Sequence, residues 1–334
     1  MKAIVCEEFG PIDALVYKEI DTPVPGKGEV RVNVKAAGVN FPDGLLVQGL
    51  YQVKPERPFI PGMEFCGEVE ALGEGVKHLK VGQRLICTSQ SYGGFAEQAI
   101  VNAKLVMPVP ENIAGEMSDV DAANIMCAHG TAHHALKQRA RLKKGETLVV
   151  LGAAGGTGLA AVQIGKAMGA RVIAVCSSAE KLAIAKANGA DDLVNNSESD
   201  LKSTIKELTG GKGANVVYDP VGGDAFDACS RAMARNGRLL VIGFASGTIP
   251  SLPVNLALVK EYSVIGVFWG SFVMHEPMPF LQNMQELFGW YKEAKVSVVT
   301  DEVFALSKTT AALAKVFDRK VKGKVVVVPD ALLK

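Results

Sequence analysis

The chain has 334 residues, 48% of them hydrophobic and 21% charged, with a formal net charge of +1. This length exceeds one ordinary domain and is enough to bury two cores. The balanced charge, without a basic cluster that carries interleaved aromatic residues, argues against nucleic acid as a partner. No apolar run approaches the length of a membrane span and no signal-peptide pattern opens the chain, so we expect a soluble, cytoplasmic protein. The six cysteines lie far apart without C-x-x-C spacing, which favours buried reduced thiols.

The first part of the chain is strand-rich, because short apolar runs alternate with turns marked by Gly and Pro. The pattern predicts strands over residues 3–6, 29–37, 64–73, 84–88 and 94–101. We therefore expect an irregular β domain.

From residue 145 onward, apolar strand patterns alternate with helical segments. Strands are expected over residues 171–176, 192–195, 215–219, 238–243 and 262–268. Such alternation is typical of a doubly wound parallel sheet. The remaining segments are a helix over 278–293, a strand over 299–304, a helix over 306–318 and a strand over 325–329. We expect this last part to return to the first domain.

The stretch 148–178 orders a strand, a glycine-rich turn, a helix and a second strand as a dinucleotide site requires. Ala153, Gly155 and Gly158 take the three positions of the G-x-G-x-x-G pattern, so a small residue replaces the first glycine. A backbone without Cβ atoms can approach a pyrophosphate, and the N–H groups that open the next helix face that anion. We expect this helix over 159–168, with Gly169 as its C-terminal cap.

The end of the second strand decides between the two nicotinamide cofactors. An NAD site places Asp or Glu there to bind the ribose 2′-hydroxyl, but this sequence has Ser177 and Ser178, followed by Lys181. Two hydroxyls and an ammonium group suit a 2′-phosphate, which predicts NADPH as the cofactor. Ser178 can also serve as a helix N-cap, and the two interpretations are compatible.

Ordered motifs along almost the whole chain resemble the zinc-independent quinone oxidoreductase branch of the medium-chain dehydrogenase/reductase superfamily. They are GVNFPDGLLVQGLY at 38–51, PFIPGMEFCGEV at 58–69, VGQRL at 81–85, GGFAEQ at 93–98, GTAHHAL at 130–136, GAAGGTG at 152–158, VVYDPVGG at 216–223, GFASG at 243–247 and KGKVVV at 322–327. The resemblance implies an α/β fold in which a Rossmann doubly wound sheet is inserted in a GroES-like β-rich catalytic domain. It also implies a cleft at the domain junction and a homodimer in which the strand at 262–268 pairs across the interface.

We place the GroES-like domain at residues 1–121, the Rossmann domain at 122–264 and the return to the catalytic domain at 265–334. The predicted cofactor contacts combine the glycine turn and residues 177–181 described above with contacts carried over by motif position at the strand ends, on the nicotinamide side and at a final-strand lysine. They are Thr131, Gly155, Gly156, Thr157, Gly158, Ser177, Ser178, Lys181, Asn196, Gly243, Phe244, Ala245, Ser246, Phe268, Trp269, Gly270 and Lys324. Asn196 departs from the aromatic residue that relatives often have there, so a stacking contact on the adenine can be missing.

The sequence predicts no metal. A catalytic zinc needs three protein ligands, but Asn40 and Met63 stand where zinc-dependent relatives have Cys and His, which leaves Cys127 alone. The clustered cysteines of a structural zinc lobe are also missing between residues 82 and 94. His129 and His133 have helical spacing but no H-E-x-x-H arrangement, so we expect these histidines and His134 on a helix surface or a domain interface.

Without a Lewis acid, reduction of an activated acceptor fits better than oxidation of an alcohol. We predict an NADPH-dependent enzyme that reduces quinones or other α,β-unsaturated carbonyls, with a small-molecule electrophile as substrate. Asn40 and Tyr51 are candidates for stabilising the developing negative charge, and Asp43 for orienting polar groups. A turn role for Asn40 or Asp43 stays open. So do two alternative functions: an enoyl thioester reductase of the same superfamily, and a non-catalytic NADPH-binding protein.

Overall fold

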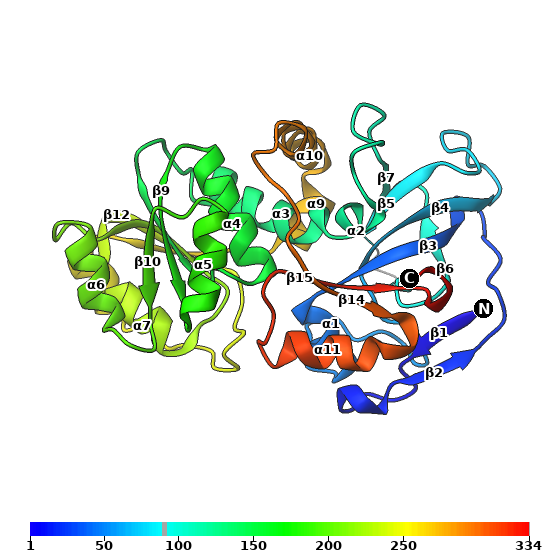
Figure 1. Cartoon of the computed structure of the whole chain (residues 1–334), viewed down its shortest axis with the longest axis horizontal. Coiled ribbons are helices and arrows are strands. Elements are labelled where there is room, and N and C mark those ends of the chain that lie inside the picture. The colour runs from blue at the N-terminus through cyan, green and yellow to red at the C-terminus, as the bar shows by residue number, and fades with distance from the viewer. Residues whose placement is uncertain (89–91, 334) are drawn as a thin grey trace. The chain divides into compact units, whose positions relative to one another are not determined.

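The computed structural model describes residues 1–88 and 92–333 (Figure 1). It divides into two compact units, of which unit 1 is Met1–Cys127 with Thr300–Lys334 and unit 2 is Ala128–Val299. Each unit has its own hydrophobic core. The chain therefore leaves a β-rich unit, builds a parallel-sheet unit and returns, which is the inserted arrangement that the sequence predicts.

Unit 1 is built mainly of strands. Its strands are β1 (Lys2–Val5), β2 (Val16–Glu19), β3 (Glu29–Val39), β4 (Glu64–Leu72), β5 (Arg84–Thr88), β6 (Gln98–Asn102), β7 (Val106–Pro108), β14 (Thr300–Ala305) and β15 (Lys324–Val328). Its helices are α1 (Phe41–Val47), α2 (Asp119–Ala122), α11 (Thr309–Phe317) and the 3₁₀ turns η1 (Ile12–Ala14), η3 (Leu306–Lys308) and η4 (Asp330–Leu332). Helix α3 (Ile125–His134) begins in unit 1.

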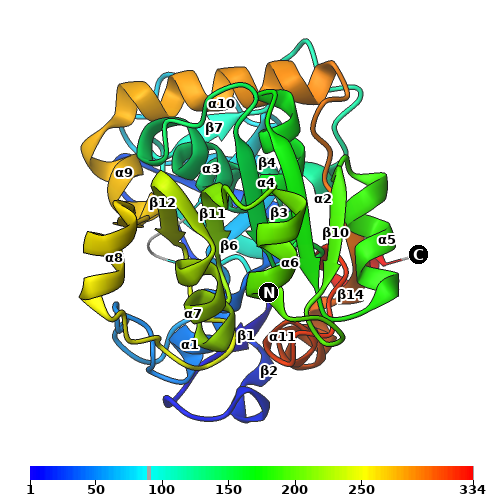
Figure 2. The same ribbon diagram turned by 90° about the vertical axis from the view of Figure 1, so that its left-hand side faces the viewer.

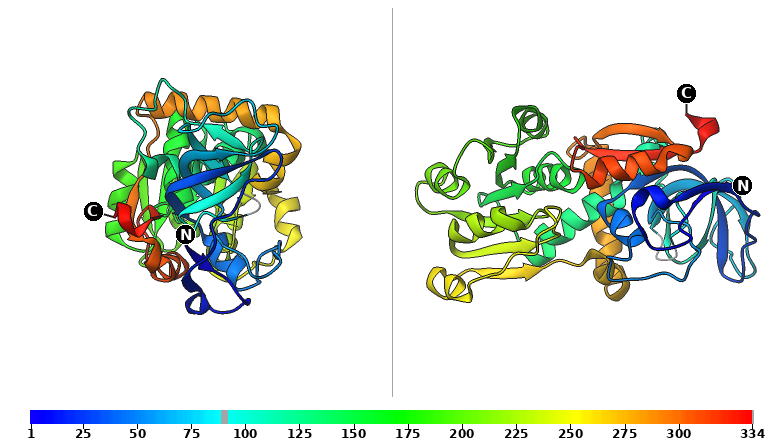
Figure 3. Two further views of the ribbon diagram at one scale, coloured as in Figure 1. Left: turned by 90° about the vertical axis from the view of Figure 1, so that its right-hand side faces the viewer. Right: turned by 90° about the horizontal axis from the view of Figure 1, so that it is seen from below.

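The main sheet of unit 1 joins both ends of the chain. Its strand order is β14-β15-β3-β4-β5-β7, with β6 paired to β3. All five residues of β15 are buried, as expected for a strand with a neighbour on each side. Figures 1 and 3 show α11 beside α1, where the rings of Phe41 and Phe317 stack with centroids 4.9 Å apart. The register of β15 against β3 places Lys324 beside the end of β3.

Unit 2 alternates strands and helices. Its strands are β8 (Thr147–Leu151), β9 (Arg171–Cys176), β10 (Asp192–Asn195), β11 (Ala214–Asp219), β12 (Met233–Val241) and β13 (Ser263–Gly266). Its helices are the rest of α3, the π-helical turn η2 (Ala135–Arg139), α4 (Gly156–Ala167), α5 (Ala179–Ala187), α6 (Leu201–Leu208), α7 (Gly223–Arg231), α8 (Val254–Lys260), α9 (Trp269–His275) and α10 (Pro277–Lys292).

The six strands of unit 2 are all parallel, in the order β10-β9-β8-β11-β12-β13. This is the 3-2-1-4-5-6 order of a Rossmann fold, in which the strand order reverses between β8 and β11. Figure 2 shows α5 and α8 at opposite edges of this sheet. The carboxyl ends of β8 and β11 therefore mark where a dinucleotide fold binds its ligand.

The segment that follows β13 differs from the predicted return to the catalytic domain at residue 265. Helices α9 and α10 belong to unit 2, and the chain re-enters unit 1 at Thr300. The reason is that α10 packs against α3 of unit 2. A hydrogen bond of 2.8 Å joins His133 Nε2 on α3 to Glu286 Oε2 on α10. The amphipathic pattern and the length of the α10 segment predict a helix, but they do not show which unit the helix packs against.

The three helix histidines do not lie on a helix surface, which was one of the two positions that the sequence predicted. His129, His133 and His134 are all buried. His134 stacks on Phe272 of α9 with ring centroids 3.9 Å apart. Burial lowers the pKa of His133 to about 4, so it is neutral near pH 7. His133 and His134 thus join α3 to α10 and α9, and His129 contacts Gln163 of α4, all within unit 2.

Candidate functional site

The glycine-rich turn between β8 and α4 is shorter than the sequence pattern predicts. Gly152 has a φ of +60°, so it is Gly152, and not the position of Ala153, that makes the turn. A Cβ atom on Gly158 would lie 2.2 Å from the Gly152 carbonyl oxygen. Helix α4 begins at Gly156 and not at residue 159, because Gly155 takes the N-cap conformation. Gly156 and Gly158 therefore lie within the first helical turn.

This first turn is a site for an anion. The first N–H groups of a helix have no partner within the helix and carry its positive dipole end. Without Cβ atoms on Gly155, Gly156 and Gly158, a pyrophosphate can approach them, as a dinucleotide requires. The Thr157 hydroxyl lies 2.5 Å from the phenol oxygen of Tyr218 on β11. The Thr157 side chain thus connects the turn to β11, at the place where the strand order of the sheet reverses.

The end of β9 carries hydroxyl groups and no carboxylate. Ser178 is the N-cap of α5, where its Oγ accepts the Lys181 N–H at 3.4 Å. The Ser177 carbonyl accepts a hydrogen bond of 3.1 Å from the Ser197 hydroxyl. Burial raises the pKa of the Cys176 thiol, and the Ala154 N–H and the charge of Lys181, in the first turn of α5, oppose this. Asn196 is exposed, and its N–H is bonded to the Cys176 carbonyl.

The loops after β11 and β12 are held together by backbone hydrogen bonds. Asp219 is buried, and its carboxylate accepts the N–H groups of Val221 and Gly222, each at 2.8 Å. The Ala245 and Ser246 N–H groups donate to the carbonyls of residues 220 and 221. Gly243, Phe244, Ala245 and Ser246 therefore lie where predicted, at the carboxyl edge of the sheet.

The predicted nicotinamide contacts lie on two helices of unit 2. Thr131 is half-buried on α3. Phe268 is 56% exposed and precedes α9, which begins with Trp269 and Gly270. A Cβ atom on Gly130 would lie 2.9 Å from the indole nitrogen of Trp269, so α3 and α9 meet closely beside Thr131.

In unit 1, Asn40 and Asp43 form the cap of α1. The Asn40 N–H donates to Asp43 Oδ2 at 2.8 Å, and the Met63 N–H donates to Asp43 Oδ1 at 3.2 Å. Asp43 is fully buried, and this burial raises the pKa of its carboxyl to about 7 against the effect of the two donors and of Lys324. The Asp43 side chain therefore has the turn role that the sequence left open.

Glu64 and Lys324 complete a buried polar cluster around the Asn40 side chain. Lys324 Nζ donates to Asn40 Oδ1 at 2.6 Å, and Asn40 Nδ2 donates to Glu64 Oε2 at 3.1 Å. The Lys324 ammonium lies 3.6 Å from Glu64 Oε2, and the Cys127 N–H donates to Glu64 Oε1 at 2.7 Å. Lys324 therefore has its protein partners in this cluster of unit 1, and its predicted contact with the cofactor stays a prediction.

Sequence reasoning missed Glu64 as a site residue. It is 0% exposed on β4, where a carboxylate is expensive to bury without partners. The signal was a Glu directly before the apolar residues at the start of the strand, EFC in EFCGEV. Only the fold shows that its partners come from the N-cap of α1, from β15 and from α3.

Tyr51 follows α1 and is half-buried. Burial raises the pKa of its phenol to about 12, with smaller effects of Cys127, Tyr92 and Asp43. Within the described part of the chain its hydroxyl has no hydrogen-bond partner. Tyr51 is therefore a protonated donor at neutral pH that is free to bind an acceptor.

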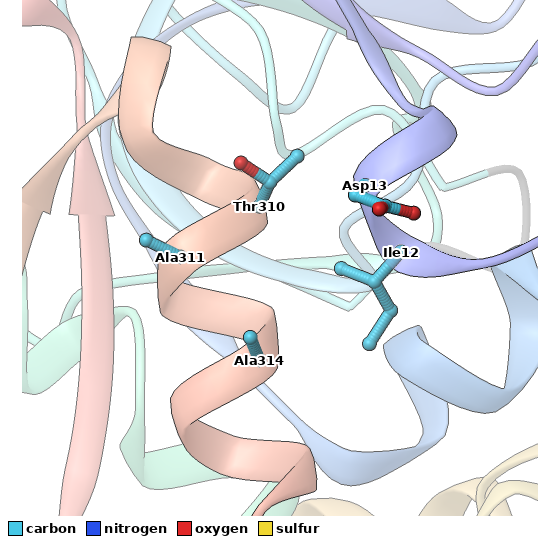
Figure 4. A pocket seen from close by; sticks show the side chains of 5 residues that line it. All are labelled: Ile12, Asp13, Thr310, Ala311 and Ala314. Atoms are coloured by element: carbon cyan, nitrogen blue, oxygen red, sulfur yellow. The ribbon is translucent and has the colours of Figure 1, made fainter.

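A pocket of about 440 Å³ lies elsewhere in unit 1. Figure 4 shows its lining on η1 and α11, by Ile12, Asp13, Thr310, Ala311 and Ala314. These side chains offer one carboxylate and one hydroxyl among small apolar groups. None of them is a predicted site residue, and the pocket supplies no donor set for an anionic cofactor.

The strand order and the glycine turn together define a dinucleotide-binding oxidoreductase fold. Comparisons with known proteins agree with this class. Residues 26–111 match the alcohol dehydrogenase GroES-like domain, and residues 156–286 match the zinc-binding dehydrogenase domain. The chain is 39% identical to quinone oxidoreductase-like protein 2 of Rattus norvegicus, over 97% of this chain and 91% of that relative.

Two similar structures are complexes with NADPH. A mycobacterial protein shares 32% identity and a TM-score of 0.90, covering 98% of this chain and all of the other. The quinone oxidoreductase of Escherichia coli shares 27% identity with the same TM-score and the same coverage. The chain thus belongs to the quinone oxidoreductase branch of the medium-chain dehydrogenase/reductase superfamily.

The name of one matching domain mentions zinc, so the donor set is the relevant test. In residues 1–88 and 92–333, no group of three or more His, Cys, Asp or Glu side chains could hold a metal ion. Glu64 faces the ammonium group of Lys324, and Asn40 and Met63 supply no thiolate or imidazole. Residues 89–91 of the stretch predicted to lack a structural lobe lie outside the described residues. The residues described do not fit a catalytic zinc, which needs three protein ligands.

Proposed function

We propose that this protein is an NADPH-dependent, metal-free reductase of quinones or other α,β-unsaturated carbonyl compounds. The observation that carries the proposal is the pairing of a dinucleotide fold with a buried polar cluster, in which Glu64 faces the ammonium group of Lys324 and no set of three metal ligands is found among the described residues. The names of the similar proteins support the substrate class. No helix in the described part of the chain is long and apolar enough to cross a membrane.

The cofactor is NADPH, and the residues of unit 2 fit it. The N–H groups of Gly156, Thr157 and Gly158 bind the pyrophosphate, because no side chain of the glycines stands before them. Ser177, Ser178 and Lys181 bind the 2′-phosphate at the end of β9, where an NAD site would have a carboxylate. Two similar structures described as NADPH complexes support this assignment.

The remaining contacts are proposed at the strand ends and on α3 and α9. At the carboxyl end of β12, the contacts are Gly243, Phe244, Ala245 and Ser246. The nicotinamide contacts are Thr131 and residues 268–270, and the residue beside the adenine is Asn196. Bound NADPH supplies the reducing equivalents. The protein has to hold the acceptor, exclude water and stabilise the oxygen that becomes negative.

Tyr51 is the proposed donor to that oxygen. Its hydroxyl is unengaged among the described residues, and a pKa raised to about 12 keeps it protonated through the physiological range. Asn40 contributes a second donor from its amide nitrogen. Asp43, held by two backbone N–H groups, orients the start of α1 and with it Asn40.

A parallel acceptor screen tests the proposal. NADPH oxidation is followed with a quinone, an enone, an enoyl-CoA ester and an alkenal, with NADH as the comparison. We expect turnover of the quinone or the enone and a preference for NADPH. The Tyr51→Phe variant should lower kcat by about 100-fold or more, as loss of one charge-stabilising donor does, while the Kd for NADPH stays unchanged.

Other outcomes of the screen point to other functions. Turnover confined to the enoyl-CoA ester would make the protein an enoyl thioester reductase. Tight binding of NADPH without turnover of any acceptor would mark a non-catalytic binding protein, and the proposed function would be wrong.

A further inference from the structure

The Asn40 amide lies between two opposite charges inside unit 1. Lys324 Nζ is 2.6 Å from its oxygen, and Glu64 Oε2 is 3.1 Å from its nitrogen. The direct distance between the ammonium and the carboxylate is 3.6 Å. Glu64 is 0% and Lys324 5% exposed, so neither charge is screened by solvent.

The chemistry of the two partners leaves one orientation for the amide. A lysine ammonium can only donate, so it must face the amide oxygen, and a carboxylate can only accept, so it must face the nitrogen. Turning the amide over would place two donors together and two acceptors together. The amide dipole therefore lies along the field of the ion pair.

Glu64, Lys324 and Asn40 differ in how well their remaining hydrogen-bonding groups are satisfied. Glu64 Oε1 is taken by the Cys127 N–H at 2.7 Å, and Lys324 also reaches the Val39 carbonyl at 3.4 Å. The second hydrogen of Asn40 Nδ2 has only the Gly38 carbonyl at 3.4 Å, which is a weak hydrogen bond. This hydrogen is the one that the cluster leaves available to another acceptor.

We infer that Glu64 and Lys324 are positioning residues, which lock the Asn40 amide so that its second N–H is presented to the oxygen of the acceptor. The inference rests on the proposed function and adds two residues to it. A buried ion pair is a weak source of stability, because the desolvation cost offsets the attraction. Its function here is orientation, since an amide that donates in only one direction needs no reorganisation as the acceptor gains charge.

The test compares removal of this ion pair with removal of a matched one. Glu64→Gln with Lys324→Met deletes both charges together, which avoids an unpaired buried charge. The control is Glu68→Gln with Lys35→Met, because Glu68 lies on the same strand β4 and pairs with Lys35 of β3 at 3.1 Å. Asn40→Ala is made alone and in combination with the first pair.

Steady-state kinetics give the first readout. We expect Glu64→Gln/Lys324→Met to lower kcat about tenfold and to change the KM for NADPH less than twofold. The control pair should leave kcat unchanged. In the Asn40→Ala background, the same two substitutions should lower kcat no further, because they act through Asn40. An unchanged kcat in the pair variant, or a full additional loss without Asn40, would overturn the inference.

Hydrogen exchange of the Asn40 side-chain amide gives a second readout that needs no turnover. With ¹⁵N-asparagine labelling, its signals are identified by their absence in Asn40→Ala. We expect slow exchange in the wild type, at least tenfold faster exchange in Glu64→Gln/Lys324→Met, and no change in the control pair. If the wild type reduces no acceptor, the proposed function fails. Faster exchange in the pair variant alone then supports the locking of the amide, and equal exchange rates refute it.

Discussion

At the scale of single residues, the partner of a side chain decides its role. The sequence predicts Lys181 as a cofactor contact from its charge beside the end of a strand, and Lys324 from its position in a family motif. The fold gives their surroundings, since Lys324 is buried against Glu64 in unit 1 and Lys181 lies in the first turn of α5, which follows β9 in unit 2. A prediction about a charge thus needs the opposite charge, which comes from a distant part of the chain.

The choice of cofactor is predicted to depend on Lys181. Lys181→Glu places a negative charge beside the proposed 2′-phosphate, so we expect the ratio of kcat/KM for NADPH to that for NADH to fall at least tenfold, or about 1.4 kcal/mol. Lys202→Glu, on the exposed side of α6, is the control and should leave the ratio unchanged. An unchanged ratio in Lys181→Glu would remove this lysine from the cofactor site.

Asp43 is predicted to make stability depend on pH. Its pKa is raised from 3.8 to about 7 by burial, so between these values the folded chain holds a proton that the unfolded chain has lost. The free energy of unfolding of the wild type, relative to Asp43→Asn, should therefore decrease as pH rises from 4 to 7, by at most about 1.4 kcal/mol per pH unit.

Urea unfolding at several pH values measures this difference. Asp318→Asn, at the exposed end of α11, serves as the control and should show a constant difference from the wild type. If Asp43→Asn also gave a difference that does not change between pH 4 and 7, the carboxyl of Asp43 would be ionised as in the unfolded chain.

At the scale of elements, the glycine pattern correctly predicts a tight turn between β8 and α4, but not which residue makes the turn or where the helix begins. Gly158 has no room for a Cβ atom, but the residue with positive φ is Gly152, one position before the pattern begins. The sequence placed the start of α4 three residues late, because glycines are poor helix formers in isolation. Close packing of the helix against the turn overrides that preference.

A Cβ atom in this turn should be costly. Gly158→Ala would place a methyl group 2.2 Å from the Gly152 carbonyl oxygen, which forces the turn to move. We expect a loss of about 1–3 kcal/mol in unfolding free energy and at least tenfold weaker binding of NADPH, measured by fluorescence titration.

Gly289→Ala is the matched control for this substitution. Gly289 lies within α10 and has open space around the position of a Cβ atom. Its replacement should stabilise the chain by up to about 1 kcal/mol, as expected for a helix interior, and leave NADPH binding unchanged. Equal effects of the two substitutions would show that Gly158 has no special role.

At the scale of the whole molecule, the six-stranded sheet ends in β13, which has a partner on one side only. Val264 of β13 is 37% exposed, and α8 beside it has no buried residue. The homodimer that the sequence predicts through this strand stays a prediction, as does the cytoplasmic location. An unpaired parallel edge with apolar residues is a surface that pairing would cover.

Val264→Lys tests the predicted dimer. A charge on an edge strand opposes pairing with a second strand, so sedimentation should show a dimer for the wild type and a monomer for this variant. Val24→Lys, in an 81% exposed loop position, should leave the assembly unchanged. A wild type that sediments as a monomer, or a variant that remains dimeric, would contradict pairing through β13.

The sequence by itself determined the local chemistry of this protein: the glycine turn after β8, the absence of a carboxylate at the end of β9, and the Asn and Tyr of the α1 region. Each of these features depends on residues that are close together in the sequence, so sequence patterns can predict them. Only the tertiary structure decided that Glu64, Lys324 and Asn40 form one buried cluster, and that α10 belongs with unit 2. The reason is that a buried charge is stable only beside its partner, and the pairing of β15 with β3 brings that partner from the other end of the chain.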